Sequence, residues 1–436
     1  MYLGLDIGTT SICAVVLDGD GNIVYTTTKA NDYHGQNGNG ERTQDPEKIF
    51  SLCEEIYRET VEKFAVKSVG ISGQMHGVLY IDKNGQAVSP LYSWQDERGN
   101  LPFENSTYAN VLSMRSGYKM ATGFGCTSVF YDFVNEQIPE TAVSFCTIGD
   151  YIAMKLAKRV TPLIHETNAA SLGLYDLKNR CWDSRTISIV GLPVLLFPEV
   201  SVDVVELGKT NDGVSVFTAI GDNQASVYGA EQSPDTFIVN IGTGSQISII
   251  AEKYAEMPAS CELRPYFNGR YLAIGCALCG GYSYRLLKDF FNTVSEKEIS
   301  YETMNGWAEN AMNKDMPTTY TLFRGTRKDP LLRASITGIS EKNFTAQALT
   351  LSVLKGISGE LKDFYNELLP ITGTRKKLVA AGNAIRMNPA LRRIIQEDYG
   401  MPLNIPSHKE EAAFGAALIA AETLENHSLK SFIKYM

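Results

Sequence analysis

The chain has 436 residues, of which 44% are hydrophobic and 20% are charged, and its formal net charge at pH 7 is −9. This length predicts two domains, each large enough for its own core, and the composition is that of an ordinary globular protein. The acidic balance argues against a nucleic-acid partner, because a nucleic-acid-binding surface is expected to be basic.

The sequence also predicts a location. The chain begins almost directly in an apolar strand, without the regions of a signal peptide, and no stretch is long and apolar enough to span a bilayer. Its eight cysteines lack disulfide-framework spacing. Cys276 and Cys279 form a Cys-x-x-Cys motif without a second ligand pair, which favours buried thiols over a zinc or redox site. We expect a cytoplasmic protein without a membrane partner.

Two short segments resemble each other across the chain. Residues 5–11 read Leu-Asp-Ile-Gly-Thr-Thr-Ser, and residues 239–245 read Val-Asn-Ile-Gly-Thr-Gly-Ser. Each lies between two apolar runs, which predicts a β-hairpin with a tight glycine turn. Glycine allows close approach of the backbone to a ligand, and hydroxyl and N–H groups donate hydrogen bonds to phosphate oxygens. One copy alone is more typical of an ordinary turn, but the pair indicates a duplicated domain that binds one polyphosphate.

A polar loop follows the first predicted helix and strand. The helix begins at Asp45 and Pro46, and the strand over residues 66–71 ends in Ser-Gly-Gln-Met-His-Gly. In open α/β sheets, ligands bind at the carboxyl ends of strands. Gln74 and His76 can therefore bind hydroxyl groups while Met75 packs against a carbon skeleton. A structural histidine is the alternative interpretation of His76.

A second polar cluster spans residues 93–98, with the sequence Ser-Trp-Gln-Asp-Glu-Arg. Trp94 and Asp96 supply the apolar platform and the hydrogen-bonding groups that a polyhydroxylated sugar needs. We expect Glu97 and Arg98 to form a solvent-exposed charged turn. Two further segments, residues 122–126 and 166–171, are rich in small residues and are predicted as loops.

The candidate catalytic acid lies at the end of the first half. A buried-type strand over residues 214–220 is followed by Gly221 and Asp222, so the acid is expected at the carboxyl edge of a sheet. There it could take a proton from a substrate hydroxyl, although Asp222 is also a good helix N-cap. Asp6 leads the first hairpin, where its carboxylate could hold Mg²⁺ beside the phosphates.

The second half contains further candidate contacts to a nucleotide. Gly280 and Gly281 lead into a predicted helix, and a predicted strand over residues 377–381 ends at Gly382 and Asn383. The chain has no G-x-x-x-x-G-K-[ST] motif, so a P-loop enzyme is excluded. The domain boundary is expected between residues 231 and 235.

These motifs together resemble the FGGY family of carbohydrate kinases over essentially the whole chain. The resemblance rests on the segments 72–77, 94–96, 121–126, 168–171, 221–228, 265–268 and 382–384. Gln-Met-His-Gly is shared by ketose kinases in general, whereas Gly-Phe-Gly-Cys and Gln-Ala-Ser-Val-Tyr favour the sedoheptulokinase branch over the xylulokinases. The resemblance implies an α/β fold with two actin-like (ribonuclease H-like) ATPase domains, residues 1–230 and 231–436, and a cleft between them.

The resemblance also implies an activity and a site. It implies ATP- and Mg²⁺-dependent phosphorylation of the terminal hydroxyl of a ketose, with Asp222 as general base and Asp6 and Asp222 at the metal, and it allows a homodimer. The implied phosphate and nucleotide contacts are Gly8, Thr9, Thr10, Gly242, Thr243, Gly244, Gly281, Gly382 and Asn383. The implied sugar contacts are Gln74, Met75, His76, Trp94 and Asp96.

One position departs from the family pattern. Many relatives carry Lys or Arg two residues after the serine of the first hairpin, where this chain has Cys13. Mg²⁺, Arg285 or Arg324 would then neutralise the phosphates. Two other classes share the paired hairpins: an actin-like filament or chaperone ATPase, which does not need the two polar loops, and a sugar sensor without catalysis, against which Asp222 argues.

Overall fold

The computed structural model describes residues 1–436 except 33, 37, 232, 313–314, 327–328, 330, 428–432 and 436. The chain forms two compact units. The first comprises Met1–Gly229, Arg264–Gly269 and Glu410–Phe432, and the second comprises Ala230–Leu263, Arg270–Lys409 and Ile433–Met436. The division after residue 229 lies beside the predicted boundary at residues 231–235. Within that predicted boundary, residue 232 lies outside the described residues. The units are not two continuous segments, because residues 264–269 and 410–427 belong to the first.

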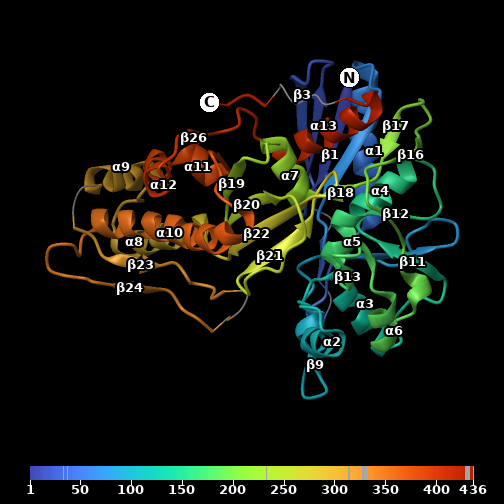
Figure 1. Cartoon of the computed structure of the whole chain (residues 1–436), viewed down its shortest axis with the longest axis horizontal. Coiled ribbons are helices and arrows are strands. Elements are labelled where there is room, and N and C mark those ends of the chain that lie inside the picture. Colours follow the sequence, from blue (N-terminus) through green and yellow to red (C-terminus); the bar gives the residue numbers. More distant parts are fainter. Residues whose placement is uncertain are drawn as a thin grey trace. The chain divides into compact units, whose positions relative to one another are not determined.

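The first unit is built on a mixed β-sheet with the strand order β16-β17-β6-β1-β2-β3 (Figure 1). β1 pairs antiparallel with β2 and parallel with β6. β17 and then β18 pair parallel with β6, one after the other along its length. The carboxyl ends of β1, β6 and β18 therefore meet at one edge of the sheet. The sheet strands are β1 (Tyr2–Ile7), β2 (Ser11–Leu17), β3 (Ile23–Ala30), β6 (Ser68–Gly73), β16 (Glu206–Lys209), β17 (Ser215–Phe217) and β18 (Ile220–Gly221).

Helices and short strand pairs complete the first unit around one apolar core. Its helices are α1 (Pro46–Lys63), α2 (Tyr108–Ser116), α3 (Gly125–Val134), α4 (Ile148–Leu156), α5 (Glu166–Leu172), α6 (Ser184–Ile189), α7 (Asp222–Ala230) and α13 (Glu411–Glu425). Its short strands are β4 (His34–Gln36), β5 (Arg42–Gln44), β7 (Leu79–Asp82), β8 (Leu91–Tyr92), β9 (Pro102–Phe103), β10 (Ser106–Thr107), β11 (Ala142–Cys146), β12 (Leu163–His165), β13 (Tyr175–Asp176), β14 (Cys181–Trp182) and β15 (Glu199–Ser201).

Helix α13 packs directly on the strands that carry the candidate site (Figure 1). A Cβ atom on Gly4 of β1 would overlap the carbonyl oxygen of Ala413, and one on Gly70 of β6 would overlap that of Ala416. Glycine at these two positions therefore permits contact between backbones. The last long helix of the chain thus fixes the position of β1 and β6.

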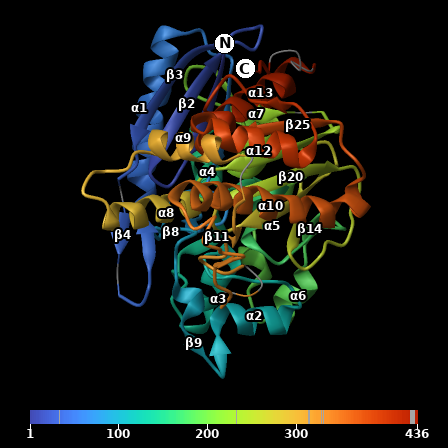
Figure 2. The same ribbon diagram turned by 90° about the vertical axis from the view of Figure 1, so that its left-hand side faces the viewer.

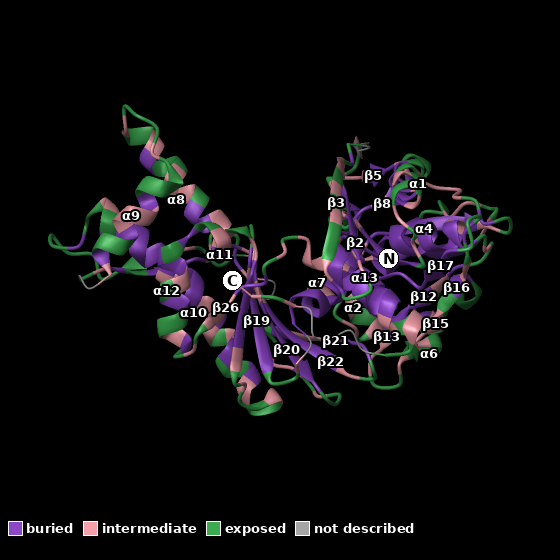
Figure 3. Cartoon of the chain, turned by 90° about the horizontal axis from the view of Figure 1, so that it is seen from above, coloured by how far each residue is buried: buried purple, intermediate pink, exposed green. Residues whose placement is uncertain are grey.

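The second unit repeats the central arrangement of the first. Its sheet has the order β21-β22-β20-β19-β25-β26, with β19 antiparallel to β20 and parallel to β25. β19 and β20 are almost completely buried (Figure 3). The strands are β19 (Thr236–Ile241), β20 (Ser245–Ala251), β21 (Cys261–Pro265), β22 (Tyr271–Ala277), β25 (Lys377–Ala381) and β26 (Leu403–Asn404), with β23 (Thr318–Tyr320) and β24 (Ser335–Thr337) paired apart. Both predicted hairpins are confirmed.

The helices of the second unit form a separate apolar core with this sheet. They are α8 (Gly281–Val294), α9 (Tyr301–Ala311), α10 (Ala346–Thr372), α11 (Asn383–Met387) and α12 (Pro389–Tyr399). The long helix α10 packs against α8, α9 and α12 and against β20 and β22 (Figure 2). Among the described residues, no helix combines the length and the apolar character needed to cross a membrane.

Candidate active site

Three side chains meet at the carboxyl edge of the first sheet. Asp6 on β1 is in register with Ser72 on β6, and Ser72 is in register with Ile220 on β18, two residues before Asp222. The Ser72 hydroxyl donates to Asp6 Oδ1 at 2.8 Å. The Asn223 N–H donates to Asp222 Oδ1 at 2.7 Å. The strand pairing therefore places Asp6 and Asp222 near each other. The position of Asp222 at the carboxyl edge is the one predicted from the strand and the glycine that precede it.

Burial controls the protonation of both carboxyl groups. Burial, together with the nearby Asp6 carboxylate, raises the pKa of Asp222 to about 7, although the Asn223 N–H and the Arg264 guanidinium oppose the shift. Burial also raises the pKa of Asp6 to about 6, against the hydrogen bond from Ser72 and with a contribution from Glu410. A carboxylate whose pKa lies near 7 can accept a proton from a hydroxyl close to neutral pH.

Helix α5 holds the strand that leads to Asp222. The sequence predicts a loop over residues 166–171, but His165 caps a helix there by accepting the Thr167 N–H, and two alanines favour the helical turn. The Thr167 hydroxyl oxygen accepts the Gly221 N–H at 3.0 Å. The Asn168 amide donates to the Ala219 carbonyl oxygen at 3.2 Å and to Asp150 Oδ1 at 2.9 Å. Sequence reasoning gave these two side chains no role, because their partners lie 18, 51 and 54 residues away in the chain.

The loop after β6 carries Gln74, Met75 and His76. The Gln74 amide donates to Gln44 Oε1 at 2.7 Å, and its own Oε1 atom is buried without a partner among the described residues. Met75 is buried, and its sulfur lies against the backbone of Gly221. His76 Nδ1 lies 2.7 Å from the Ser171 carbonyl oxygen, and its ring stacks on Phe124 with centroids 4.8 Å apart.

The second polar cluster divides into an exposed and a buried part. Trp94 is 48% exposed, and its indole N–H donates to the Thr9 hydroxyl oxygen at 2.9 Å, which joins this cluster to the first hairpin. Asp96 is only 1% exposed and pairs with Arg98 at 2.8 Å, while Arg98 pairs with Asp132 at 2.7 Å.

The expectation of a solvent-exposed Arg98 is wrong. Its side chain is 4% exposed, because Asp96 and Asp132 balance its charge in the interior and Tyr92 stacks against its guanidinium at 3.9 Å. Glu97 is exposed as expected. Arg98 is therefore buried because Asp96 and Asp132 pair with it, whereas the neighbouring Glu97 remains at the surface.

The second hairpin borders a pocket of about 860 Å³ within the second unit. Of the predicted nucleotide contacts, Gly242, Thr243, Gly281 and Asn383 line it, together with apolar side chains such as Leu354, Ile357 and Leu391. Gly244 and Gly382 are not among the lining residues, but both shape the turn. The Gly244 carbonyl accepts the Gly242 N–H at 3.0 Å, and Gly382 adopts a φ of +93° against the Ile241 carbonyl.

The two arginines predicted to neutralise the phosphates, Arg285 and Arg324, both belong to the second unit. Arg285 lines the pocket of the second unit, and both Arg285 and Arg324 lie over the Tyr282 ring, at 4.8 and 4.1 Å from its centroid. In the first unit, Cys13 is buried opposite Asp6 in the β1–β2 register, and burial raises the pKa of its thiol to about 12. Cys13 is therefore neutral at physiological pH.

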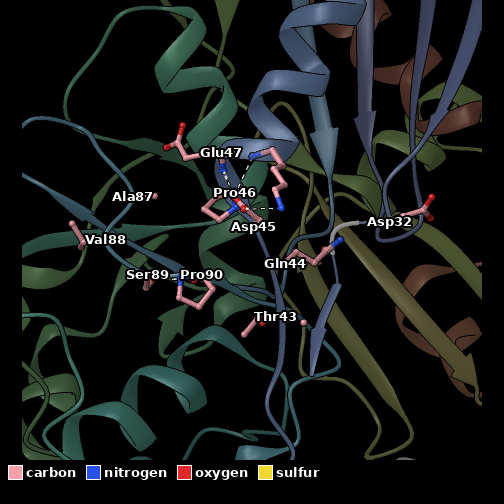
Figure 4. Close-up of a pocket in the computed structure, with 12 residues that line it drawn as sticks. Asp32, Thr43, Gln44, Asp45, Pro46, Glu47, Ala87, Val88, Ser89 and Pro90 are labelled. Atoms are coloured by element: carbon pink, nitrogen blue, oxygen red, sulfur yellow. Dashed lines mark hydrogen bonds and ion pairs between the residues drawn. The ribbon is translucent and has the colours of Figure 1, made fainter. Parts of the chain in front are cut away.

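A second pocket of about 730 Å³ lies in the first unit beside the start of α1 (Figure 4). Asp45 caps this helix by accepting the N–H groups of Glu47 and Lys48. None of the predicted site residues lines this pocket, although Gln44 does. No cluster of three or more His, Cys, Asp or Glu side chains suited to a metal occurs in the described part of the chain.

Comparisons with known proteins agree with this architecture. The N-terminal domain of the FGGY family of carbohydrate kinases matches residues 1–230. Sedoheptulokinase of Mus musculus is 29% identical over 96% of both chains, and a xylulose kinase of Staphylococcus epidermidis is 25% identical over 100% of this chain and 91% of its own. The crystal structure of a xylulose kinase from Brucella ovis superposes with a TM-score of 0.87 at 21% identity, covering 99% of this chain and 92% of that one.

The solved structures confirm the expected fold class, in which both units have the actin-like, ribonuclease H-like α/β fold. The family match spans 230 of the 436 residues, more than half of the chain. A filament ATPase, a chaperone ATPase and a non-catalytic sensor are thereby set aside. The chain belongs to the FGGY family of carbohydrate kinases, which are phosphotransferases with an alcohol group as acceptor.

Proposed function

We propose that this kinase transfers the γ-phosphoryl group of ATP to the terminal hydroxyl of a ketose, and that the ketose is sedoheptulose. The observation that carries the proposal is the carboxylate of Asp222, which lies at the carboxyl edge of the sheet beside Asp6 and has a pKa near 7. Similarity to sedoheptulokinases over nearly the whole chain supports the seven-carbon substrate. A pentulose kinase such as a xylulose kinase is the second candidate.

In the proposed reaction, Asp222 takes the proton from the acceptor hydroxyl, and the oxygen of that hydroxyl bonds to the γ-phosphorus. The bond from the γ-phosphorus to the bridging oxygen breaks, and ADP leaves with that oxygen. Because phosphoryl transfer depends mainly on positioning and charge neutralisation, the base would contribute about 10²- to 10⁴-fold. Gln74, Met75, His76, Trp94 and Asp96 would orient the sugar.

The carboxylates of Asp6 and Asp222 suit Mg²⁺. This ion prefers oxygen ligands, keeps several waters and binds through one or two carboxylates together with substrate phosphates. Two neighbouring carboxylates fit that pattern, and the described residues add no third His, Cys, Asp or Glu to them. Bound there, Mg²⁺ would neutralise charge on the transferring phosphoryl group.

The nucleotide would use both hairpins. The apolar pocket of the second unit suits the adenosine, with Gly281, Gly382 and Asn383 around it. Gly242, Thr243 and Gly244 of that unit and Gly8, Thr9 and Thr10 of the first would contact phosphates through backbone N–H and hydroxyl groups. A cytoplasmic location, a homodimer and the lack of a nucleic-acid partner stay predictions.

A coupled assay of ADP release against a panel of ketoses tests the proposal. Wild type is expected to turn over with sedoheptulose and to lose turnover in Asp222→Asn. Turnover with five-carbon but not seven-carbon ketoses would replace the substrate by a pentulose. ATP hydrolysis that no sugar stimulates would contradict the proposed reaction itself.

A further inference from the structure

The two phosphate hairpins align in sequence, but their turns differ in length and are held by different groups: residues 8–11 separate the paired Ile7 and Ile12, and residues 242–244 separate the paired Ile241 and Ser245. In the second hairpin, the start of α8 supplies the donors. The Gly281 N–H donates to the Gly242 carbonyl at 2.8 Å, and the N–H groups of Gly280 and Tyr282 donate to the Thr243 carbonyl at 2.9 and 3.0 Å. Backbone groups of the same unit therefore bind the carbonyl oxygens of this turn.

In the first hairpin, two amide side chains donate hydrogen bonds to the carbonyl oxygens of the turn. Asn31 Nδ2 donates to the Gly8 carbonyl at 2.9 Å, and its backbone N–H donates to the Thr10 carbonyl at 2.9 Å. Gln44 Nε2 donates to the Thr9 carbonyl at 3.0 Å. Gly8 and Thr9 align in sequence with Gly242 and Thr243, so the carbonyl oxygens of corresponding residues are bound in both turns.

The direction of these carbonyls determines the direction of the neighbouring N–H groups. In a trans peptide the C=O and the following N–H point in opposite directions. With the Gly8 and Thr9 carbonyls turned toward Asn31 and Gln44, the N–H groups of Thr9 and Thr10 point away from them. Neither N–H group has an acceptor among the described residues, and Thr10 is exposed.

We propose that Asn31 and Gln44 are positioning residues that aim the N–H groups of Thr9 and Thr10 at a phosphate of the nucleotide. This inference rests on the proposed function, in which the first hairpin binds nucleotide phosphates. Consecutive N–H groups that converge on one side form an anion-binding concavity, and prearranged donors bind more tightly than donors that must be ordered first.

The burial of Asn31 and Gln44, and the donor and acceptor roles of the Gln44 amide, indicate that both side chains are held in fixed orientations. Asn31 is 0% exposed and Gln44 is 1% exposed. Because the Thr9 carbonyl can only accept, Gln44 must turn its NH₂ toward it and its oxygen toward Gln74, whose Nε2 donates to that oxygen at 2.7 Å. Gln44 ends β5 directly before Asp45, which caps α1, so its backbone is anchored too (Figure 4).

Phosphate-dependent ligand affinity tests the proposal. Calorimetric titration would compare adenosine with a non-hydrolysable ATP analogue on wild type, Gln44→Met, Asn31→Asp and the control Gln137→Met, whose side chain is exposed. We expect Gln44→Met and Asn31→Asp to weaken the analogue by about 5- to 30-fold, the effect of losing 1–2 kcal/mol, and to leave adenosine unchanged. Gln137→Met should bind both ligands as wild type does.

Two results would overturn the proposal: unchanged affinity for the analogue, or equal weakening of adenosine and the analogue. A wild-type protein that binds neither ligand would contradict the proposed function instead. If Gln44→Met does not fold, Gln44→Glu keeps the side-chain length but turns an oxygen toward the Thr9 carbonyl. It should weaken the analogue at least as much, again with adenosine unchanged.

Discussion

Thr167 Oγ1 accepts the backbone N–H of Gly221 at 3.0 Å, one residue before the proposed base Asp222. On the same helix, the Asn168 amide donates to the carbonyl of Ala219, and the Ser171 carbonyl contacts His76. A single helix, α5, therefore holds both the approach to the base and a side chain of the proposed sugar loop. The orientation of Asp222 relative to the sugar should depend on these contacts.

Thr167→Val should lower kcat about 10- to 100-fold with less than about a twofold change in either KM, because small misplacements of a reacting group are costly. Steady-state kinetics would check this, with Thr161→Val as an exposed control. Thr167→Ser, which keeps the hydroxyl, should restore most of kcat. Equal activity of the Val and Ser variants would show that the hydroxyl does not position Asp222.

Asp222→Asn should fold and bind nucleotide but lower kcat by about 10²- to 10⁴-fold, the range for loss of a general base. ADP release under saturating substrates measures the rate, and calorimetry measures nucleotide binding. Asp20→Asn, at an exposed aspartate, is the control. Undiminished turnover in Asp222→Asn would remove Asp222 as the base.

The pH dependence of kcat/KM follows from the same carboxyl group. The base must be ionised, and its pKa is about 7 in the free protein. Wild-type kcat/KM should therefore rise as pH increases from 5 and level off above about pH 7, with Asp222→Asn lacking this transition. A profile that is already flat between pH 5 and 8 would contradict a base with this pKa.

Protein stability should show the opposite trend with pH. The pKa of Asp222 is raised from 3.8 to about 7 on folding, so the folded protein binds the proton more tightly than the unfolded chain. This contribution to stability is present below about pH 4 and is lost as pH rises through about 7. Asp222→Asn should therefore be more stable than wild type at pH 8 by about 2–5 °C in Tm, with a smaller difference at pH 5. Calorimetric melting at both pH values measures this difference in Tm. An equal difference at pH 5 and pH 8 would contradict the proposed effect of Asp222 ionisation on stability.

Asp96→Asn should be strongly destabilising, because among the described residues it leaves the buried Arg98 with Asp132 as its one carboxylate partner. Breaking one side of a buried ion pair costs about 3–5 kcal/mol. Thermal melting would detect this, and Glu97→Gln, at an exposed neighbour, should melt as wild type does. An unchanged Tm together with a raised KM for the sugar would instead make Asp96 mainly a sugar ligand.

Local patterns predicted the parts of the site that depend on neighbouring residues. The two hairpins follow from glycine and threonine between apolar runs, and the edge position of Asp222 follows from the strand and glycine before it. The burial of Arg98 could not be predicted, because it depends on Asp132, 34 residues away. The roles of Asn31 and Gln44 were missed for the same reason, since each amide reaches a hairpin carbonyl 23 or 35 residues away.

The packing of α13 on Gly4 and Gly70 has a consequence for biosynthesis. Chains are synthesised from the N-terminus, and their domains generally fold as units. When residues 1–230 have emerged, every residue of the apolar core of the first unit is present, but the helix that packs on β1 and β6 is still missing, because it spans residues 411–425. A chain that stops after residue 230 would leave Gly4 and Gly70 without the helix backbone that packs on them. The segment that the family comparison recognises as a domain therefore lacks one helix of the first unit.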